Sequence, residues 1–452
     1  MNEKKSNIGQ QPIRDARTLG IPKMLILGLQ HMFAMFGATV LVPILVQSYG
    51  LPLSIQTTLL FAGLGTLLFH VCTKFKIPAF LGSSFAFLGG FAAMGAMDQG
   101  IYAAMDASEK LQYACGGIVA AGLLYVVLAA IIKAVGVHKV MHYLPPVVTG
   151  PIIILIGLNL APSAVSNAST CWWLALVAMA IIIVANIWGK GMIKIIPILL
   201  GVVGSYIVAL IAGKVDFSTM EGVAIVGLQP FFTDFGGSIA KFDISAILVM
   251  APIAIASMME HIGDMSAISA TVGENFIEDP GLHRTLIGDG IATSLSAMFG
   301  GPANTTYGEN TGVLVLSKVH DPRVIRLAAV YALVLSFSPW FAAFINSIPA
   351  AIIGGVSFIL YGMISAIGVR NVVENQVDFT NSRNLIIAAV ILVCGLGFTG
   401  GLTFQVGGAS ITLTSLAIAA IAGIILNAIL PGNDFHFGKS ANSDASANLG
   451  QY

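Results

Sequence analysis

The chain has 452 residues, of which 56% are hydrophobic and only 9% are charged, and its 21 Lys and Arg balance its 21 Asp and Glu. A soluble domain carries about a quarter of charged residues, so this composition excludes an ordinary soluble enzyme. Because positive charge is not in excess, we also expect no nucleic-acid partner.

Apolar segments of about 17–25 residues, each long enough to cross a bilayer, recur along the chain. Three of the apolar segments are broken by Gly, Ser, Thr, Asn or Asp: 81–97, 285–299 and 304–317. The uninterrupted segments are 24–47, 55–73, 112–132, 144–160, 172–188, 195–212, 244–262, 324–345, 350–367, 384–399 and 409–430. Together they predict an all-α polytopic membrane protein with about 14 transmembrane segments.

The polar ends and the basic residues predict how the chain lies in the membrane. Residues 1–23 are polar, and the first apolar segment is too long for a signal peptide, so we expect a cytoplasmic N-terminal segment. With 14 crossings, only Lys110, Lys214 and Lys241 of the 21 basic residues then fall outside, in agreement with the positive-inside rule. The tail, 432–452, is polar and is predicted to be cytoplasmic and disordered.

Three pairs of short segments resemble each other in the two halves of the chain, in the same order. The pairs are LQHMFAMFGAT (29–39) with MEHIGDMSAIS (259–269), GSSFAF (82–87) with NTTYGEN (304–310), and LPPVVTGPIIILIGL (144–158) with IPAAIIGGVSFILYG (348–362). Seven spans in each half would insert the second half upside down relative to the first. Inverted repeats with paired interrupted spans are typical of secondary transporters, whose site lies where the broken spans meet.

The two interrupted spans, 81–87 and 303–310, are rich in small and polar residues. Such residues indicate extended or unwound backbone, which is tolerated at membrane depth only when it is buried in protein or lines a cavity. Free N–H and C=O groups there would become ligand contacts. The alternative is that the small residues only allow helices to pack closely.

Few ionisable groups lie within the predicted spans, and each needs an explanation because a charge at the bilayer centre costs at least about 2.5–3.5 kcal/mol. They are His31, Glu260, His261, Asp264, Asp289 and Glu309. Glu260 and Asp264 are four residues apart and share one helix face. Two carboxylates this close do not both ionise cheaply, so one is expected to hold a proton. That suits a proton-coupled carrier, although a sodium site would use the same acids.

Structural roles are the alternative for several of these groups. Asp264 could be a buried acid bonded to a hydroxyl such as Thr305 or Thr306, and His31 could join two helices by a hydrogen bond. His261 is expected to point away from the Glu260 face.

Asp289 is expected near a span end beside Arg284, which gives it a structural role. The sequence has no Walker motif or other phosphate-binding loop. We therefore expect neither ATP-driven pumping nor enzyme activity, and no cofactor or metal.

Several longer motifs resemble those of the nucleobase/ascorbate transporter family, and among its members those of the bacterial uracil permeases. They are LQHMFAMFGATVLVPIL (29–45), IPAFLGSSFAF (77–87), EHIGD (260–264), DPGLHRTLIGDG (279–290), NTTYGENTGV (304–313) and GGVSFILYGMI (354–364). The resemblance runs from about residue 20 to residue 430.

The resemblance implies a core domain of spans 1–4 and 8–11 and a gate domain of spans 5–7 and 12–14, with short antiparallel strands in spans 3 and 10. It also implies a homodimer in the bacterial inner membrane that works by an elevator-type motion. The corresponding segments are an N-terminal segment 1–23, core 24–134 and 244–345, gate 135–213 and 346–431, an extracellular loop 214–243 and the tail 432–452.

Carried over by position, the resemblance makes Glu260 and Glu309 the two carboxylates that face the nucleobase. Phe85 and Tyr307 would flank the base, and the backbone at Phe85 and Gly308 would approach its carbonyl groups. The remaining expected site residues are Ser84 beside the substrate, and Glu260, Asp264, His31 and Thr305 for the coupling ion.

These residue types suit a pyrimidine, because uracil has two ring N–H donors and two carbonyl acceptors. A dry site for it needs acceptors such as carboxylates, backbone N–H donors and an aromatic wall. Glu309, in ENTG, resembles the uracil branch of the family, whereas Asp264 stands where uracil permeases often have His and resembles purine and ascorbate carriers. We therefore predict a uracil importer coupled to protons. The alternative is a xanthine or broader nucleobase carrier, driven by protons or by sodium.

Overall fold

The computed structural model describes residues 12–98, 100–227, 237–406 and 409–432. All but the first residue of the predicted tail, 432–452, lies outside the described residues. The helices are α1 (Ile21–Ser48), α2 (Ile55–Cys72), α3 (Leu88–Gly95), α4 (Ala107–Val135), α5 (Val137–Tyr143), α6 (Pro146–Ser169), α7 (Trp172–Ile187), α8 (Met192–Ile195), α9 (Pro197–Ile211), α11 (Ile244–Met250), α12 (Ile253–Val272), α13 (Leu282–Met298), α14 (Gly308–Ser317), α15 (Pro322–Ser336), α16 (Pro339–Asn346), α17 (Ala350–Glu374), α18 (Ser382–Gly397) and α19 (Ser415–Ile429).

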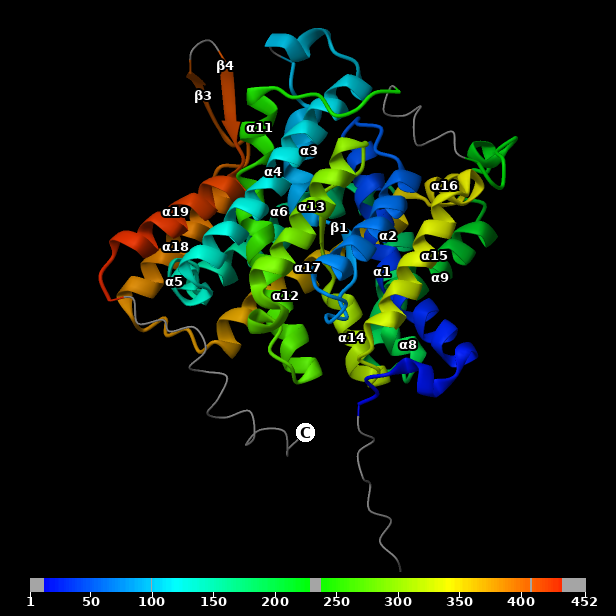
Figure 1. Cartoon of the computed structure of the whole chain (residues 1–452). Coiled ribbons are helices and arrows are strands. Elements are labelled where there is room, and N and C mark those ends of the chain that lie inside the picture. The colour runs from blue at the N-terminus through cyan, green and yellow to red at the C-terminus, as the bar shows by residue number, and fades with distance from the viewer. Residues whose placement is uncertain (1–11, 99, 228–236, 407–408, 433–452) are drawn as a thin grey trace, which may run out of the picture.

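Within the described part of the chain, four strands form two separate antiparallel pairs. They are β1 (Leu81–Ser83) with β2 (Asn304–Thr306), and β3 (Leu402–Val406) with β4 (Ala409–Leu413). Figure 1 shows the first pair in the middle of the helices and the second projecting at one end. The strands expected in span 3 (81–97) and span 10 (304–317) are therefore present, and their pairing is antiparallel.

The helical class is confirmed, and the structure is that of a multi-pass membrane protein. Among the described residues, six helices are long and apolar enough to cross a bilayer, or seven if α15 and α16 form one span bent by 88°. Other expected spans are shorter apolar helices, and span 10 is a strand followed by a helix. The count of 14 crossings therefore stays a prediction.

Three expected spans have different boundaries in the structure. The span expected over 244–262 continues to the end of α12, where Gly273 adopts a left-handed conformation with φ of 75°. The span expected over 324–345 bends before Pro339, because proline does not donate to the preceding turn and holds Ser338 extended. The span expected over 409–430 begins as strand β4, and α19 starts only at Ser415.

Glycines let helices from the two halves of the chain approach closely. A Cβ on Gly157 of α6 would lie 2.2 Å from the backbone oxygen of Tyr361 on α17. A Cβ on Gly368 of α17 would lie 2.6 Å from the backbone nitrogen of Ile154 on α6. Most of the matched segment 144–158 lies in α6, and most of 348–362 lies in α17. The two members of this predicted repeat pair therefore pack against each other. Close approach of backbones through small residues is the usual way in which membrane helices associate.

The N-terminal stretch before α1 is held against the end of α14. Ile13 pairs with Val319 in a parallel bridge, and the Ala16 N–H donates to Asp321 Oδ2 over 2.7 Å. Asp321 also caps α15 by accepting from the Arg323 N–H. Hydrogen bonds from Arg17 hold the pKa of the Asp15 carboxyl at about 2, below its usual 3.8.

We expect Asp321→Ala to release this stretch, because it removes a helix cap and leaves the buried Ala16 N–H without its acceptor. Each loss costs about 1–2 kcal/mol, so tryptic cleavage after Arg14 and Arg17 should become about tenfold faster or more. Cleavage after Lys214, at a distant site, serves as the internal control. Equal cleavage rates at Arg17 in both proteins would contradict the anchoring role.

Candidate functional site

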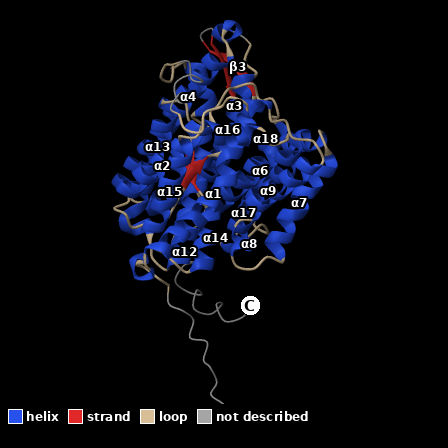
Figure 2. Ribbon diagram, turned by 90° about the vertical axis from the view of Figure 1, so that its right-hand side faces the viewer, coloured by secondary structure: helices blue, strands red, loops and turns tan. Residues whose placement is uncertain are grey.

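The two interrupted spans meet at the strand pair β1–β2, seen as the central strands in Figure 2. The register pairs Leu81 with Thr306 and Ser83 with Asn304, and the Ser84 N–H donates to the Ala303 oxygen over 2.8 Å. The Leu81 N–H donates to Thr66 Oγ1 over 2.9 Å, which ties β1 to α2. Such short strands persist because their free backbone groups are buried in protein and paired.

A helix begins directly after each strand. The chain after β1 forms a 3-10 turn over Phe85–Phe87 and then α3, whereas β2 is followed by Tyr307 and α14. The first N–H groups of a helix have no partner within the helix, so these two ends direct donors toward the strand pair. A site between them would favour an acceptor or a partial negative charge.

Three carboxylates lie close to this point. Glu260 and Asp264 are on α12, and Glu309 is the second residue of α14. Glu260 interacts electrostatically with both of the other groups. A Cβ on Gly308 would lie only 3.6 Å from Asp264 Oδ1, so Asp264 faces the start of α14. The structure thus brings together the acids that the sequence assigns to substrate and ion.

Thr306, and not the predicted coupling residue Thr305, contacts Asp264. The Thr306 hydroxyl donates to Asp264 Oδ2 over 3.0 Å, whereas the buried Thr305 hydroxyl has no hydrogen-bond partner among the described residues. Adjacent residues of a strand point to opposite faces, so only one of two neighbouring threonines can reach α12. The sequence alone does not show which face is which.

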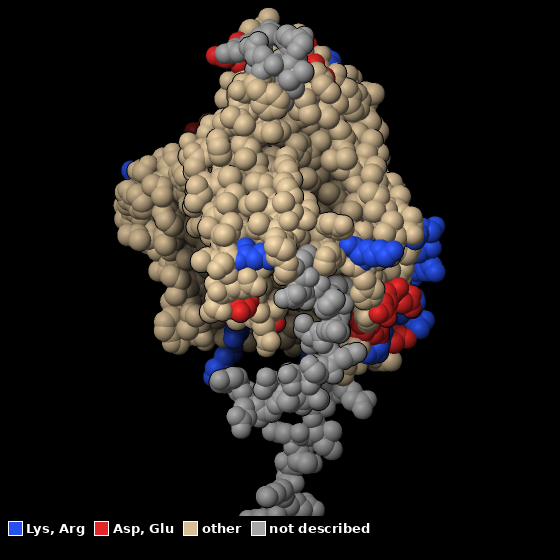
Figure 3. Space-filling view, turned by 90° about the vertical axis from the view of Figure 1, so that its left-hand side faces the viewer, with Lys and Arg blue, Asp and Glu red and all other residues tan. Residues whose placement is uncertain are grey.

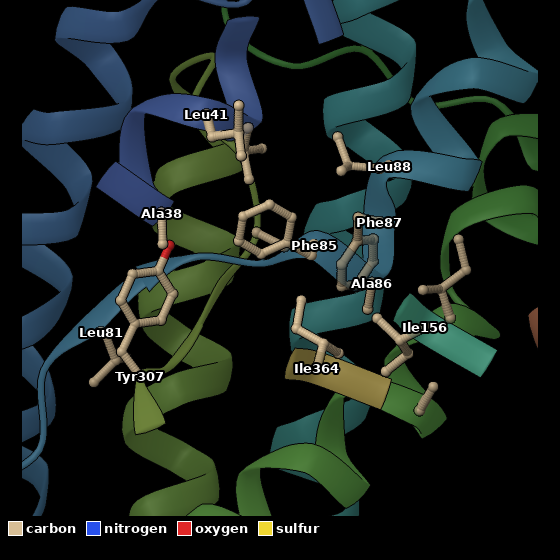
Figure 4. Close-up of a cluster of buried hydrophobic side chains, with 14 of the residues drawn as sticks. Ala38, Leu41, Leu81, Phe85, Ala86, Phe87, Leu88, Ile156, Tyr307 and Ile364 are labelled. Carbon is tan, nitrogen blue, oxygen red and sulfur yellow. The ribbon is translucent and has the colours of Figure 1, made fainter. Parts of the chain in front are cut away.

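Phe85 and Tyr307 lie on different sides of the chain at β1. Figure 4 shows the Tyr307 ring beside Ala38 and Leu81 and the Phe85 ring further along the chain. The Phe85 ring packs edge-on against Tyr361 of α17, with 6.1 Å between ring centroids. Phe85 therefore lies between the strand pair and a helix of the predicted gate domain, which agrees with a flanking aromatic wall.

The side chain of Tyr307 serves the strand pair. Its hydroxyl donates to the backbone oxygen of Ser83 over 2.8 Å, and a Cβ on Gly82 would lie 2.3 Å from its ring. The ring thus fills the space that a side chain at position 82 would need. The ring therefore holds the strands together, and its flanking of the substrate stays a prediction.

Gly82→Ala is expected to destabilise the protein by about 1–3 kcal/mol, the usual effect of overpacking a tightly filled region. Shortening the facing ring with Tyr307→Leu should relieve this clash, so the double variant should lose less stability than the sum of the single losses. Thermal unfolding of the four proteins in detergent measures the coupling. Additive losses would contradict the packing of Tyr307 on Gly82.

Ser84 and Gly308 occupy the ends of the two broken spans. Ser84 is fully buried, and its hydroxyl lies 3.4 Å from the hydroxyl of Ser257 on α12. Gly308 is the first residue of α14. Ser84 is therefore adjacent to α12 through Ser257, and Gly308 is adjacent to it through Asp264. Their approach to a ligand stays a prediction.

His31 is joined to α14 through Asn310. The Asn310 amide donates to the His31 backbone oxygen over 3.0 Å and lies 3.2 Å from His31 Nδ1. This bond matches the structural alternative for His31, a link between two helices, rather than a direct contact with Asp264. Asn310 was not assigned a role from the sequence, although it directly follows Glu309.

The sequence predicts Asp289 beside Arg284, but the structure places it beside His261, where it is buried. Asp289 Oδ2 lies 3.0 Å from His261 Nδ1, and both side chains are fully buried. Arg284 instead donates to the Cys72 backbone oxygen over 3.1 Å. Residues five apart on a helix point in directions about 140° apart, so Asp289 and Arg284 face different neighbours.

Two broken spans that meet beside buried carboxylates are typical of membrane transporters. Residues 22–403 match the model of the Permease family. The chain therefore belongs to this family of permeases, which makes it a transporter, and the family resemblance of its motifs is confirmed.

The chain is similar over almost its whole length to two proteins named uracil permease. The one from Bacillus caldolyticus is 43% identical over 429 residues, which cover 93% of this chain and 94% of that protein. The one from Bacillus subtilis (strain 168) is 40% identical over 444 residues, covering 95% and 97%.

Solved structures of anion transporters share the fold at low sequence identity. The transmembrane domain of a cyanobacterial bicarbonate transporter, BicA, aligns with a TM-score of 0.58 at 16% identity, over 92% of this chain and 99% of that one. The structure of SLC26A9 aligns with a TM-score of 0.64 at 11% identity, over 92% and 65%.

Proposed function

We propose that this permease imports uracil and couples that import to the entry of protons. The uracil permeases named above support the substrate, since 40% identity or more extends over nearly the full chain. Glu309 in the ENTG motif supports the same substrate. A proton-driven importer also suits a site in which three carboxylates lie close together.

One observation carries the proposal most directly. Glu260 Oε2 is buried and has no hydrogen-bond partner among the described residues. A buried acceptor without a donor is costly, and a ring N–H of uracil is a donor of the right kind. Glu309, at the start of α14, supplies a second acceptor for the other ring N–H.

The helix ends complement the carboxylates. Free N–H groups in the first turns after β1 and β2 would donate to the two uracil carbonyls. The edge of Phe85, backed by Tyr361, would pack against the flat ring. Each polar group of uracil then has a partner, and an analogue that lacks one of them leaves a buried protein group unpaired.

Asp264 is the group that we assign to the proton. It lies beside Glu309 and Glu260, so its protonation would relieve repulsion among three acids at the moment when substrate binds. Exchange of that proton on the opposite side would then favour release. The core domain would carry site and substrate across the membrane against the gate domain, as an elevator.

The proposal extends to the oligomeric state, the location and the orientation of the protein. It would be a homodimer in the plasma membrane of a bacterium, with both ends of the chain in the cytoplasm. Figure 1 is compatible with this orientation, because the stretch before α1 and the end of α14 lie at the opposite end of the molecule from β3 and β4.

Uptake of labelled uracil into sealed liposomes tests the proposal. An imposed proton gradient should drive accumulation, and excess unlabelled uracil, but not xanthine, should block it. A sodium gradient without a proton gradient should be ineffective. Sodium-driven uptake, or competition by xanthine, would replace the proposal by its alternative.

That alternative, a xanthine or broader nucleobase carrier driven by sodium, has one observation in its favour. The oxygens of Asp264 and Thr306 are 3.0 Å apart beside the start of α14. Hard cations bind to oxygen ligands of this type. The two gradients in the same experiment separate the possibilities.

A further inference from the structure

A groove of about 650 Å³ lies between the last turns of α4 and the short helix α5. Its α4 wall consists of Leu128, Ile131 and Val135. The opposite wall is formed by His138, Lys139, Val140, His142, Tyr143 and Leu144. One wall is thus aliphatic, and the other mixes aliphatic residues with basic and aromatic ones.

The apolar lining of this groove faces outward. Ile131, Val135 and Tyr143 are 46%, 48% and 53% exposed. At the end of a membrane helix, side chains exposed to this extent contact lipid acyl chains. A tyrosine with one apolar and one polar end is also typical of the boundary between acyl chains and headgroups.

The charge around the groove is positive. Lys139 and Lys133 are exposed, and no Asp or Glu occurs in the sequence between Glu109, in the first turn of α4, and Asp216. This stretch contains the rest of α4 and all of α5. Helix α19, which packs against α5, has no acidic residue either. An anionic group at this place would meet cations and no carboxylate from the last turns of α4, from α5 or from α19.

The start of α13 adds to this positive charge. Lys133 and Arg284 both interact electrostatically with His283. On the face drawn in Figure 3, Lys and Arg side chains lie toward one end of the molecule with Asp and Glu side chains among and below them, and the surface above is mostly uncharged. Lysines at the end of a membrane helix are attracted by an anionic membrane leaflet.

Helix α5 joins the predicted core and gate domains. Its start follows Gly136, whose φ of 95° allows a sharp change of direction after α4. Its end is held to α19, because the side-chain amide of Asn427 donates to the backbone oxygens of His142 and Tyr143 over 3.2 Å each. A molecule bound between α4 and α5 would therefore contact both the end of the predicted core domain and the start of the predicted gate domain.

We propose that this groove binds an anionic phospholipid from the leaflet on the side predicted to be cytoplasmic. An acyl chain lies along Leu128, Ile131 and Val135, and the phosphate lies near Lys139, with Lys133 close by. Because α5 connects the predicted domains, the bound lipid restrains their relative motion and alters the transport rate.

Photo-crosslinking tests the site directly. The protein is reconstituted in phosphatidylcholine liposomes that contain a trace of phosphatidylglycerol with a photoreactive acyl chain, and labelled peptides are mapped by mass spectrometry. Label should concentrate in residues 128–144 and should be displaced by unlabelled phosphatidylglycerol but not by phosphatidylcholine. Labelling requires neither uracil nor a gradient, so its result is independent of the proposed transport function.

Two variants with the same charge change give the matched comparison. Lys139→Glu should lower labelling of residues 128–144 by about fivefold or more, since each lysine near an anionic surface contributes about that factor in affinity. Lys190→Glu changes an exposed lysine between α7 and α8, away from the groove, and should keep the wild-type labelling. Equal labelling in the two variants would overturn the proposal.

A second pair of variants tests the shape of the groove. Ile131→Trp should fill it and reduce labelling, whereas Leu123→Trp, also exposed on α4 but outside the lining, should not. A photoreactive phosphatidylcholine that labels residues 128–144 as strongly as phosphatidylglycerol would show an ordinary lipid annulus and refute selectivity. Label spread evenly over all exposed helices would refute the site itself.

Discussion

Replacing Glu309 with glutamine is expected to weaken uracil binding by about 10- to 150-fold. The amide keeps the size of the side chain but removes the negative charge, and a hydrogen bond to a charged group contributes about 1.5–3 kcal/mol. Glutamine also presents an NH₂ group that clashes with a ring N–H of uracil unless the amide turns around. Transport at low uracil concentration should fall by the same factor or more.

Equilibrium binding to the purified protein and uptake into liposomes measure this effect. Glu374→Gln is a matched control, because it makes the same chemical change at an exposed position of α17, where the carboxylate pairs with Arg370. Both variants should show unchanged expression and thermal unfolding. Wild-type uracil kinetics in Glu309→Gln would remove Glu309 from the site.

Glutamine at this position should also change which bases compete. Because an amide both donates and accepts, the Glu309→Gln site can pair with a ring edge that alternates an N–H and a carbonyl. Competition by purine bases that present such an edge should rise relative to competition by uracil. Loss of all binding, with the fold intact, would show that Glu309 is needed for charge alone.

The site was predictable where short-range sequence patterns determine it. Small and hydroxyl residues at 81–87 and 303–310 indicate interrupted spans, and the structure has β1 and β2 there. Glu260 and Asp264 follow from helical spacing, since residues four apart share a face. These features need only the local chain and the cost of charge in a bilayer.

Contacts between distant segments were not predictable in the same way. Nothing in the spacing of residues 261 and 289 shows that this histidine and aspartate meet in the fold. The choice between Thr305 and Thr306 depends on which face of β2 turns toward α12. The sequence places β4, but not β3, within a predicted span, 409–430, because a strand and a buried helix have the same apolar composition over a few residues.

Asp264→Asn is expected to separate binding from coupling. Asparagine has nearly the same shape as aspartate, and its amide oxygen can still accept the hydrogen bond that Thr306 donates to Asp264 over 3.0 Å. The site should therefore keep its geometry, and the affinity for uracil should change by no more than about threefold, or about 0.6 kcal/mol. What the variant loses is a group that takes up and releases a proton.

The accumulation of uracil against a gradient reports that loss. With one proton carried per uracil, a gradient of one pH unit drives about tenfold accumulation, because each tenfold ratio corresponds to about 1.4 kcal/mol. Asp264→Asn should bring the internal concentration only to the external one, while the exchange of internal for external uracil continues.

Thr306→Val is the companion variant, because it removes the hydrogen bond but keeps the carboxylate that we assign to the proton. It should retain proton-driven accumulation and shift only the pH at which accumulation is half-maximal. If Asp264→Asn accumulates uracil as the wild type does, with the same dependence on pH, then Asp264 is structural. Glu260, whose Oε2 is the buried acceptor without a partner among the described residues, would then be the group that carries the proton.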